Sequence, residues 1–147
     1  MGAPWVVHCD GSAVPNPGRM GLGAVMVGPD GVRHTVSERG PGVGCNNEAE
    51  LRALMAALAV LKMQGATALV VHSDSSILVE QLGRAGAAPV ARLALLYDEA
   101  RAALAAFEQA EVHWIPGHRN SEADGLARDA LGLPPRPATR RRPAKKR

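Results

Sequence analysis

Trp5-Val-Val-His-Cys-Asp-Gly-Ser-Ala-Val-Pro-Asn-Pro-Gly18 is the stretch that decides the fold. Its first six residues are largely apolar, which predicts a buried strand that ends at Asp10. Glycine, proline and asparagine follow closely, a composition typical of a turn over residues 11–18. A carboxylate at the end of a buried strand is costly unless a partner neutralises its charge. Asp10 is therefore a candidate ligand for a metal ion.

The rest of the chain predicts a mixed sheet flanked by helices. Apolar segments bounded by turn residues predict strands at residues 5–10, 21–27, 32–38, 68–72 and 111–115. Apolar residues at helical spacing predict helices at residues 46–64, 75–82, 89–107 and 121–131. The first three strands are joined by turns and the later ones by helices. We therefore expect an α/β fold with a five-stranded mixed sheet, three antiparallel strands first and then parallel strands.

Glycine, proline and asparagine mark the expected ends of these elements. Pro29-Asp-Gly31 predicts a hairpin turn between the second and third strands. The glycine-rich residues 40–44 predict a break after the third strand. Asn46 or Asn47 is expected to cap the first long helix, and Gly65 is expected to end it.

Basic residues are concentrated at the end of the chain. The formal net charge is +3, yet residues 133–147 hold seven basic residues and no acid. The other 132 residues hold ten basic and fourteen acidic residues, so the body of the protein is not a general polyanion binder. We expect one domain over residues 1–132, followed over 133–147 by a basic, disordered tail that could bind nucleic acid.

The composition indicates an ordinary globular protein. Apolar residues make up 46% of the chain and aromatic residues only 3%, so alanine and leucine must supply much of the core. No apolar run approaches the length of a membrane span, and the first residues do not resemble a signal peptide. Cys9 and Cys45 are the only cysteines, and nothing indicates a disulfide scaffold. We expect a cytoplasmic monomer that does not bind membranes.

Four carboxylates are candidate metal ligands: Asp10, Glu50, Asp74 and Asp124. Asp10 and Asp74 are expected at the carboxyl ends of strands, where open α/β sheets bind their ligands. Carboxylates that converge from the ends of several elements suit Mg²⁺ or Mn²⁺, which take oxygen ligands. Helix geometry does not choose between Glu50 and Glu48, because both flank the leucine stripe at similar angles.

Two of these carboxylates have a structural alternative. Asp74 could cap the helix that follows it, although Ser73 and Ser75 could do so equally well. Asp124 stands three residues after Ser121, so the two could form a capping box at the start of the last helix. Four other histidines show no ligand spacing and are expected to be structural or exposed: His8, His34, His72 and His113.

Five segments, in this order, resemble the motifs of the type 1 ribonuclease H family. They are residues 10–18, 46–51, 73–75, 114–118 and 120–127. The resemblance spans roughly residues 5–131. It implies a ribonuclease H-like fold and an endonuclease that hydrolyses the RNA strand of RNA–DNA hybrids. It also implies two Mg²⁺ or Mn²⁺ ions in each active site. Two metals can together activate a water and stabilise the leaving oxygen.

The resemblance also implies roles for single residues. The catalytic residues would be Asp10, Glu50, Asp74, His118 and Asp124. Asp10 would bridge both ions, Asp74 and Asp124 would complete one or both sites, and Glu50 would hold the second ion. Only the family register, three residues after Asn47, selects Glu50 over Glu48. His118 would move a proton or aid product release, which suits a group that titrates near neutrality.

The resemblance points to substrate-binding residues as well. These are Ser12, Asn16, Cys45, Asn46, Asn47 and Ser76. Asn16 and Asn47 match positions that contact the nucleic acid backbone, including the 2′-hydroxyl that distinguishes RNA from DNA. Cys45 stands where many members have a threonine that holds a phosphate of the DNA strand. Ser76 stands where a glutamine often contacts a base.

Departures from the family keep other functions open. The changes at Cys45 and Ser76 motivate a broader ribonuclease that also cuts double-stranded RNA. The segment between Asp74 and Trp114 lacks the basic protrusion with which some members grip substrate, and the tail could replace it. A nucleic-acid-binding module without catalysis is a further alternative. The retention of four acids argues against it, because negative charge near phosphates weakens binding. An unrelated α/β protein is the last alternative.

Overall fold

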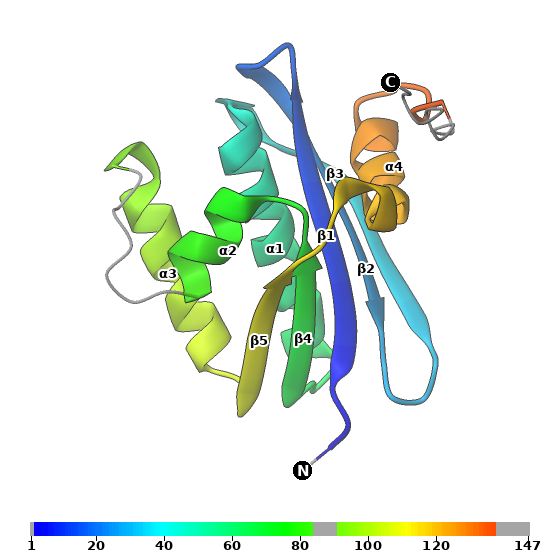
Figure 1. Ribbon diagram of the computed structural model, residues 1–147, viewed down its shortest axis with the longest axis vertical. Coiled ribbons are helices and arrows are strands. Elements are labelled where there is room, and N and C mark those ends of the chain that lie inside the picture. The colour runs from blue at the N-terminus through cyan, green and yellow to red at the C-terminus, as the bar shows by residue number, and fades with distance from the viewer. Residues whose placement is uncertain (1, 84–90, 138–147) are drawn as a thin grey trace, which may run out of the picture.

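The computed structural model describes residues 2–83 and 91–137 (Figure 1). The strands are β1 (Trp5–Val14), β2 (Gly18–Val27), β3 (Arg33–Gly44), β4 (Ala68–Ser73) and β5 (Gln109–Trp114). The α-helices are α1 (Asn46–Met63), α2 (Ser76–Gly83), α3 (Ala94–Ala105) and α4 (Ser121–Ala130). Short 3₁₀ helices cover Ala91–Leu93 and Gly117–Arg119. Within the described residues, no helix has the length and apolarity that a membrane crossing requires.

The five strands form one mixed sheet in the order β3-β2-β1-β4-β5. β2 pairs antiparallel with both β1 and β3, whereas β4 pairs parallel with both β1 and β5. The antiparallel strands follow one another along the chain, and the parallel strands are reached through helices (Figure 1). This arrangement confirms the predicted fold class and places β1 at the seam between the two halves.

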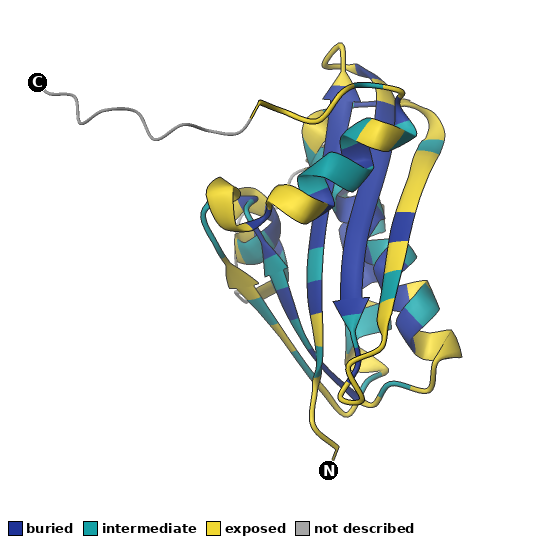
Figure 2. Ribbon diagram, turned by 90° about the vertical axis from the view of Figure 1, so that its right-hand side faces the viewer, coloured by how far each residue is buried: buried dark blue, intermediate teal, exposed yellow. Residues whose placement is uncertain are grey.

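Helices cover the two faces of the sheet unequally. α1 packs against β1 and β2 on one face, and α3 packs beside α1. α4 packs against β1, β2 and β3 on the other face, so β1 and β2 lie between two helices (Figure 2). Glycine permits both contacts: a Cβ at Gly11 would overlap the backbone of Ala49 in α1, and one at Gly23 would overlap the carbonyl oxygen of Ala123 in α4.

Several element boundaries differ from the predictions. β1 extends to Val14 and β3 extends to Gly44, so neither the predicted turn at 11–18 nor the predicted break at 40–44 occupies its full span. The reason is pairing with β2, which extends through Val14 of β1 and, after a register irregularity between Arg19 and Gly21, includes Val43 and Gly44 of β3. The N-cap of α1 is Cys45, whose sulfur accepts a hydrogen bond from Glu48 N. Gly65, with φ of 75°, follows the end of α1 as predicted.

The core is built mainly from aliphatic side chains, as the composition predicted. The inward face of α1 contributes buried leucines, namely Leu51, Leu54, Leu58 and Leu61. Tyr97 of α3 is the one fully buried aromatic residue in the described part of the chain. The helix predicted at 89–107 begins in part outside the described residues, and its described portion is a 3₁₀ turn followed by α3.

Candidate active site

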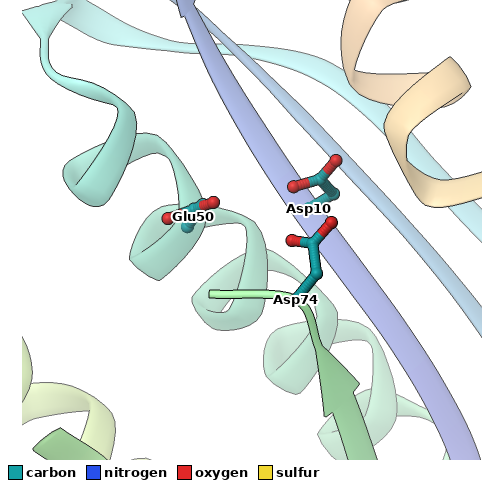
Figure 3. Close-up of side chains that lie close together, drawn as sticks. All are labelled: Asp10, Glu50 and Asp74. Atoms are coloured by element: carbon teal, nitrogen blue, oxygen red, sulfur yellow. The ribbon is translucent and has the colours of Figure 1, made fainter. Parts of the chain in front are cut away.

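Three carboxylates from three different elements converge at the seam of the sheet. Asp10 lies on β1, Glu50 on α1, and Asp74 directly after β4. One oxygen from each lies within 4.8 Å of the others (Figure 3). Within the described residues, this is the one group of three or more such side chains close enough to share a metal ion.

The two halves of the sheet create the space for this cluster. The parallel pairing of β1 with β4 ends at His8 and His72, and β4 itself ends at Ser73. β1 continues past this point and keeps only its antiparallel partner β2. The prediction that Asp10 ends its strand is therefore wrong. Asp10 lies within β1, just past the end of the parallel pairing with β4. There, nothing from β4 blocks its approach to Glu50 and Asp74.

Contacts around the cluster favour one side of two of the alternatives. Glu48 pairs with Arg52, 2.7 Å away on the next turn of α1, whereas Glu50 joins the carboxylate cluster. Ser75 caps α2, because its hydroxyl oxygen accepts a hydrogen bond from Leu78 N at 3.1 Å. Asp74 is therefore not needed as a cap.

Asp124 lies beside the cluster on the first turn of α4. No side chain caps the N-terminus of α4, so the capping box that Ser121 and Asp124 could form is absent. Asp124 Oδ2 instead accepts a hydrogen bond from Arg136 Nε at 2.9 Å. All four predicted carboxylates line one open cleft of about 900 Å³. His118 also lines it, from the 3₁₀ turn after β5.

Burial and mutual repulsion make the ionised cluster costly without a cation. Asp10 is only 6% exposed. Burial, reinforced by the charges of Asp74, Glu50 and Asp124, raises the pKa of Asp10 to about 9. Burial raises the pKa of Glu50 to about 7, although a hydrogen bond with Ser75 opposes the change. Burial and the charge of Asp124 raise the pKa of Asp74 as well.

The donor set is suited to a hard divalent cation. Its atoms are carboxylate oxygens, which Mg²⁺ and Mn²⁺ favour, whereas softer metals prefer sulfur ligands. A bound cation would offset the burial and the repulsion that raise the pKa values of these acids. The residues present therefore fit the metal that the family resemblance implies.

Asn120 is a site residue that sequence reasoning missed. It is 1% exposed, and its Nδ2 donates a hydrogen bond to the carbonyl oxygen of Cys9 at 2.9 Å. A hydrogen bond from the same side chain also lowers the pKa of Asp74. Asn120 therefore links the backbone next to Asp10 with Asp74. Its place before a helix suggests an ordinary cap in the sequence, so no local signal separates this role from capping.

Two of the six predicted substrate-binding residues line the cleft, and the other four are not part of its lining. Ser12 and Asn46 line the cleft itself. Asn46 Oδ1 accepts a hydrogen bond from Ala13 N at 2.8 Å, and Asn46 N donates to Asn16 Oδ1 at 3.1 Å, which joins α1 to the β1–β2 turn. Cys45 begins the same helix, and Asn47 is half-buried beside it. Ser76 is exposed at the start of α2.

Three of the remaining histidines form a row that the sequence did not reveal. The parallel register places His8, His72 and His113 opposite one another on β1, β4 and β5. The rings of His8 and His72 are stacked with centroids 4.8 Å apart. Burial lowers the pKa of both His8 and His72. Only the register of a parallel sheet brings these residues together, and single-chain spacing carries no sign of it. His34 lies apart, with its ring next to Trp5.

Comparison with known proteins bears on the family of this chain. The family model described as reverse transcriptase-like matches residues 8–130. A bifunctional protein of Mycobacterium tuberculosis is 37% identical over 129 residues, which cover 86% of this chain and 35% of that protein. The chain thus spans about a third of the length of that curated relative. A ribonuclease HI of Halobacterium salinarum is 34% identical over 126 residues, covering 84% of this chain and 62% of that protein.

Solved structures agree with these sequence relationships. RNase H1 from Halobacterium salinarum superposes with a TM-score of 0.82 at 30% identity, covering 88% of this chain and 98% of that one. The N-terminal RNase H domain of the Mycobacterium tuberculosis protein gives a TM-score of 0.80 at 34% identity, covering 88% and 99%. LC11-RNase H1 in complex with an RNA/DNA hybrid gives 0.79 at 27% identity, covering 87% and 96%. Fold, carboxylate site and relatives together show that the chain belongs to the type 1 ribonuclease H family.

Proposed function

We propose that this protein is an endonuclease that hydrolyses the RNA strand of RNA–DNA hybrids with two divalent metal ions. The observation that carries the proposal is the cluster of Asp10, Glu50 and Asp74, whose oxygens lie within 4.8 Å of one another in an open cleft. The hybrid-bound structure of LC11-RNase H1, which has the same fold, supports the choice of substrate.

The four carboxylates would hold Mg²⁺ or Mn²⁺. Asp10 and Asp74 face each other across the seam, Glu50 approaches from α1, and Asp124 approaches from α4. Bound divalent ions would polarise the scissile phosphate and favour ionisation of the attacking water. The cleft is open rather than enclosed, which would allow a polymer to enter it.

The chain's own residues would position the reacting groups. Asn120 is buried and bonded to the backbone at Cys9, so it fixes the geometry between β1 and Asp74. His118 lies on the wall of the cleft. We assign it proton transfer or assistance in product release, because its imidazole lines the same cleft as the four carboxylates.

Residues at the start of α1 would contact the nucleic acid. Asn16, Asn46 and the backbone of Ala13 are joined by hydrogen bonds next to the cleft, which makes this corner a preformed polar surface. We assign backbone and 2′-hydroxyl recognition to Asn16, Asn46 and Asn47, with Ser12 at the cleft floor. Ser76 lies at the start of α2, where a base contact by its short side chain is weaker than that of a glutamine.

The same proposal covers the organisation of the chain. Residues 1–132 would form the catalytic domain, and residues 133–147 would form the basic tail. Residues 138–147 lie outside the described part of the structure. A monomeric state and a cytoplasmic location remain predictions.

Cleavage of one labelled RNA strand tests the proposal. The strand is presented single, paired with RNA and paired with DNA, and each form is incubated in Mg²⁺, Mn²⁺ or EDTA. Asp74→Asn is expected to lose at least about two orders of magnitude in rate, since it removes a charged ligand from the transition-state environment. Circular dichroism and gel retardation of the hybrid check that folding and binding survive. Wild-type turnover by this variant would refute the assignment.

A second candidate is a ribonuclease that also cuts double-stranded RNA. Cys45 favours it, because the sulfur already accepts hydrogen bonds from Arg92 at 3.0 Å and from Glu48 N at 3.4 Å. A thiol is also a weak hydrogen-bond partner for a phosphate of a DNA strand. Cleavage of the RNA duplex at a rate near that of the hybrid would establish the broader activity. Cleavage of the hybrid alone would exclude it.

A further inference from the structure

A cationic side chain from residues 134–137, called here the C-terminal segment, lies at the edge of the carboxylate cluster. Arg136 Nε is 2.9 Å from Asp124 Oδ2. The side chain of Asp124 is only 15% exposed, whereas that of Arg136 is 60% exposed. Pro135, Arg136 and Pro137 line the same cleft as the four carboxylates. The C-terminal segment therefore forms part of the wall of the proposed active site.

The end of α4 is built so as to send the chain back toward the cleft. Gly132 has φ of 73°, and Leu133 N donates to Arg128 O at 3.0 Å, so the chain reverses after the helix. Arg128 Nε then donates to Pro134 O at 2.9 Å and holds the returning segment against α4. The position of Arg136 near the first turn of α4 follows from these contacts.

The chemistry of the pair makes it a competitor for cations. Prolines on both sides of Arg136 restrict the backbone, so the segment has few alternative conformations. The guanidinium stays charged at any physiological pH, so it cannot leave Asp124 by losing a proton. The hydrogen bond with Asp124 and the charges of Asp10 and Asp74 raise the pKa of Arg136 further. Arg136 can therefore leave only by moving away.

We propose that Arg136 is a built-in counter-ion of Asp124, and that a divalent cation gains Asp124 as a ligand only by displacing the C-terminal segment from the cleft. The proposal rests on the proposed function in one respect, namely that the carboxylates are metal ligands. It adds a competition within the chain itself: the Arg136 pair lowers the apparent affinity of the site for metal.

Metal titration of the full chain tests this competition. Binding of Mn²⁺ is measured by calorimetry for wild type, Arg136→Gln and Arg136→Lys. Arg19→Gln is the matched control, because it removes one positive charge from an exposed position on β2 outside the cleft. Arg136→Gln is expected to tighten the apparent Kd about two- to fivefold, the range for loss of a partly exposed ion pair. Arg136→Lys should lie between wild type and Arg136→Gln.

Thermal unfolding supplies a second readout that does not depend on catalysis. In EDTA, Arg136→Gln should lower Tm, because Asp124 loses its counter-ion while Asp10 and Asp74 remain close. In saturating Mn²⁺ that loss should disappear, so the metal-induced rise in Tm is larger for Arg136→Gln than for wild type. In an Asp124→Asn background, Arg136→Gln should change Kd and Tm much less than it does in wild type, because only the weaker attraction of Arg136 to Asp10 and Asp74 remains.

The outcomes separate this proposal from the proposed function. If Mn²⁺ binds and the hybrid is cut, but Arg136→Gln binds Mn²⁺ as wild type does, the counter-ion role is wrong and the function stands. An equal gain in affinity for Arg19→Gln would also overturn it, because the effect would then be one of net charge. If wild type binds no Mn²⁺ and cuts nothing, both proposals fail.

Discussion

The antiparallel half of the sheet is more closely packed than the outer strand of the parallel half. β1 and β2 lie between α1 and α4, and residues 20–26 of β2 are all buried. β5, at the far edge of the parallel half, has no buried residue, and Trp114 at its end is 53% exposed (Figure 2). The close-packed half supplies Asp10 and Glu50, and the open half supplies Asp74. The close-packed half thus positions two of the candidate metal ligands, and the third follows a strand of the more exposed half.

Glycine substitutions should give the largest difference in stability between the two halves. Gly23→Ala forces a Cβ into the carbonyl of Ala123, so α4 must move away from β2. We expect a loss of about 2–4 kcal/mol in the free energy of unfolding, as for other overpacked contacts. Gly83→Ala, at the end of α2 in the parallel half, meets no atom within 4 Å. It should be neutral or stabilise by up to about 1 kcal/mol.

Urea unfolding followed by circular dichroism measures both glycine variants. Comparable m-values are required for the comparison, since a changed m-value would indicate a different denatured or native state. Equal losses for Gly23→Ala and Gly83→Ala would show that the two halves are packed alike.

Replacing one acid from each half should give an effect of intermediate size. In EDTA, folded wild type keeps a proton on Asp10 up to a pKa of about 9, whereas the unfolded chain releases it near 3.8. The folded state therefore binds more protons, and its stability falls as pH rises through this window. Asp10→Asn escapes the loss and should be more stable than wild type by roughly 1–3 kcal/mol at pH 8.

The matched variant Asp74→Asn should gain less, because Asp74 is half-buried rather than buried. Thermal melts of both variants between pH 4 and pH 8 provide the test. The advantage of Asp10→Asn should shrink toward pH 4, because there the unfolded wild-type chain also begins to hold the Asp10 proton and the folded state no longer binds more protons than the unfolded state. A constant difference across this range would mean that charge burial is not its cause.

A surface ion pair between β3 and α4 should have the smallest effect. Arg33 pairs with Glu122, but their side chains are 50% and 56% exposed. Arg33→Gln should therefore cost less than about 0.5 kcal/mol, and added salt should reduce that cost further, because it screens exposed charges. A cost comparable to that of Gly23→Ala would assign the hold on α4 to charge rather than to close packing.

The sequence predicted the fold class, and it singled out four carboxylates that the structure brings to one cleft. Strand periodicity, the hairpin turn and the order of elements suffice for the mixed sheet. Family register was needed to choose Glu50 over Glu48, since helix geometry treats them alike. The structure supplies an independent reason for that choice, because Glu48 is engaged with Arg52.

What the sequence could not predict depends on contacts between distant segments. The extension of β1 through Val14 requires β2 as a partner, and the turn-like composition of residues 11–18 hides it. The buried position of Asn120 depends on the carbonyl of Cys9, far away along the chain. The return of Arg136 to Asp124 is likewise invisible in composition, which indicates only a charged tail.

The wide separation of the carboxylates along the chain has a consequence for assembly. Asp10 comes from the first strand and Asp124 from the last helix. The four carboxylates therefore come together only after the sheet has formed and α4 has packed against it. A chain that has not completed this topology offers metal no more than scattered single carboxylates. A divalent ion bound by all of these carboxylates would therefore favour the complete fold over every partly folded form, and would shift the folding equilibrium toward it.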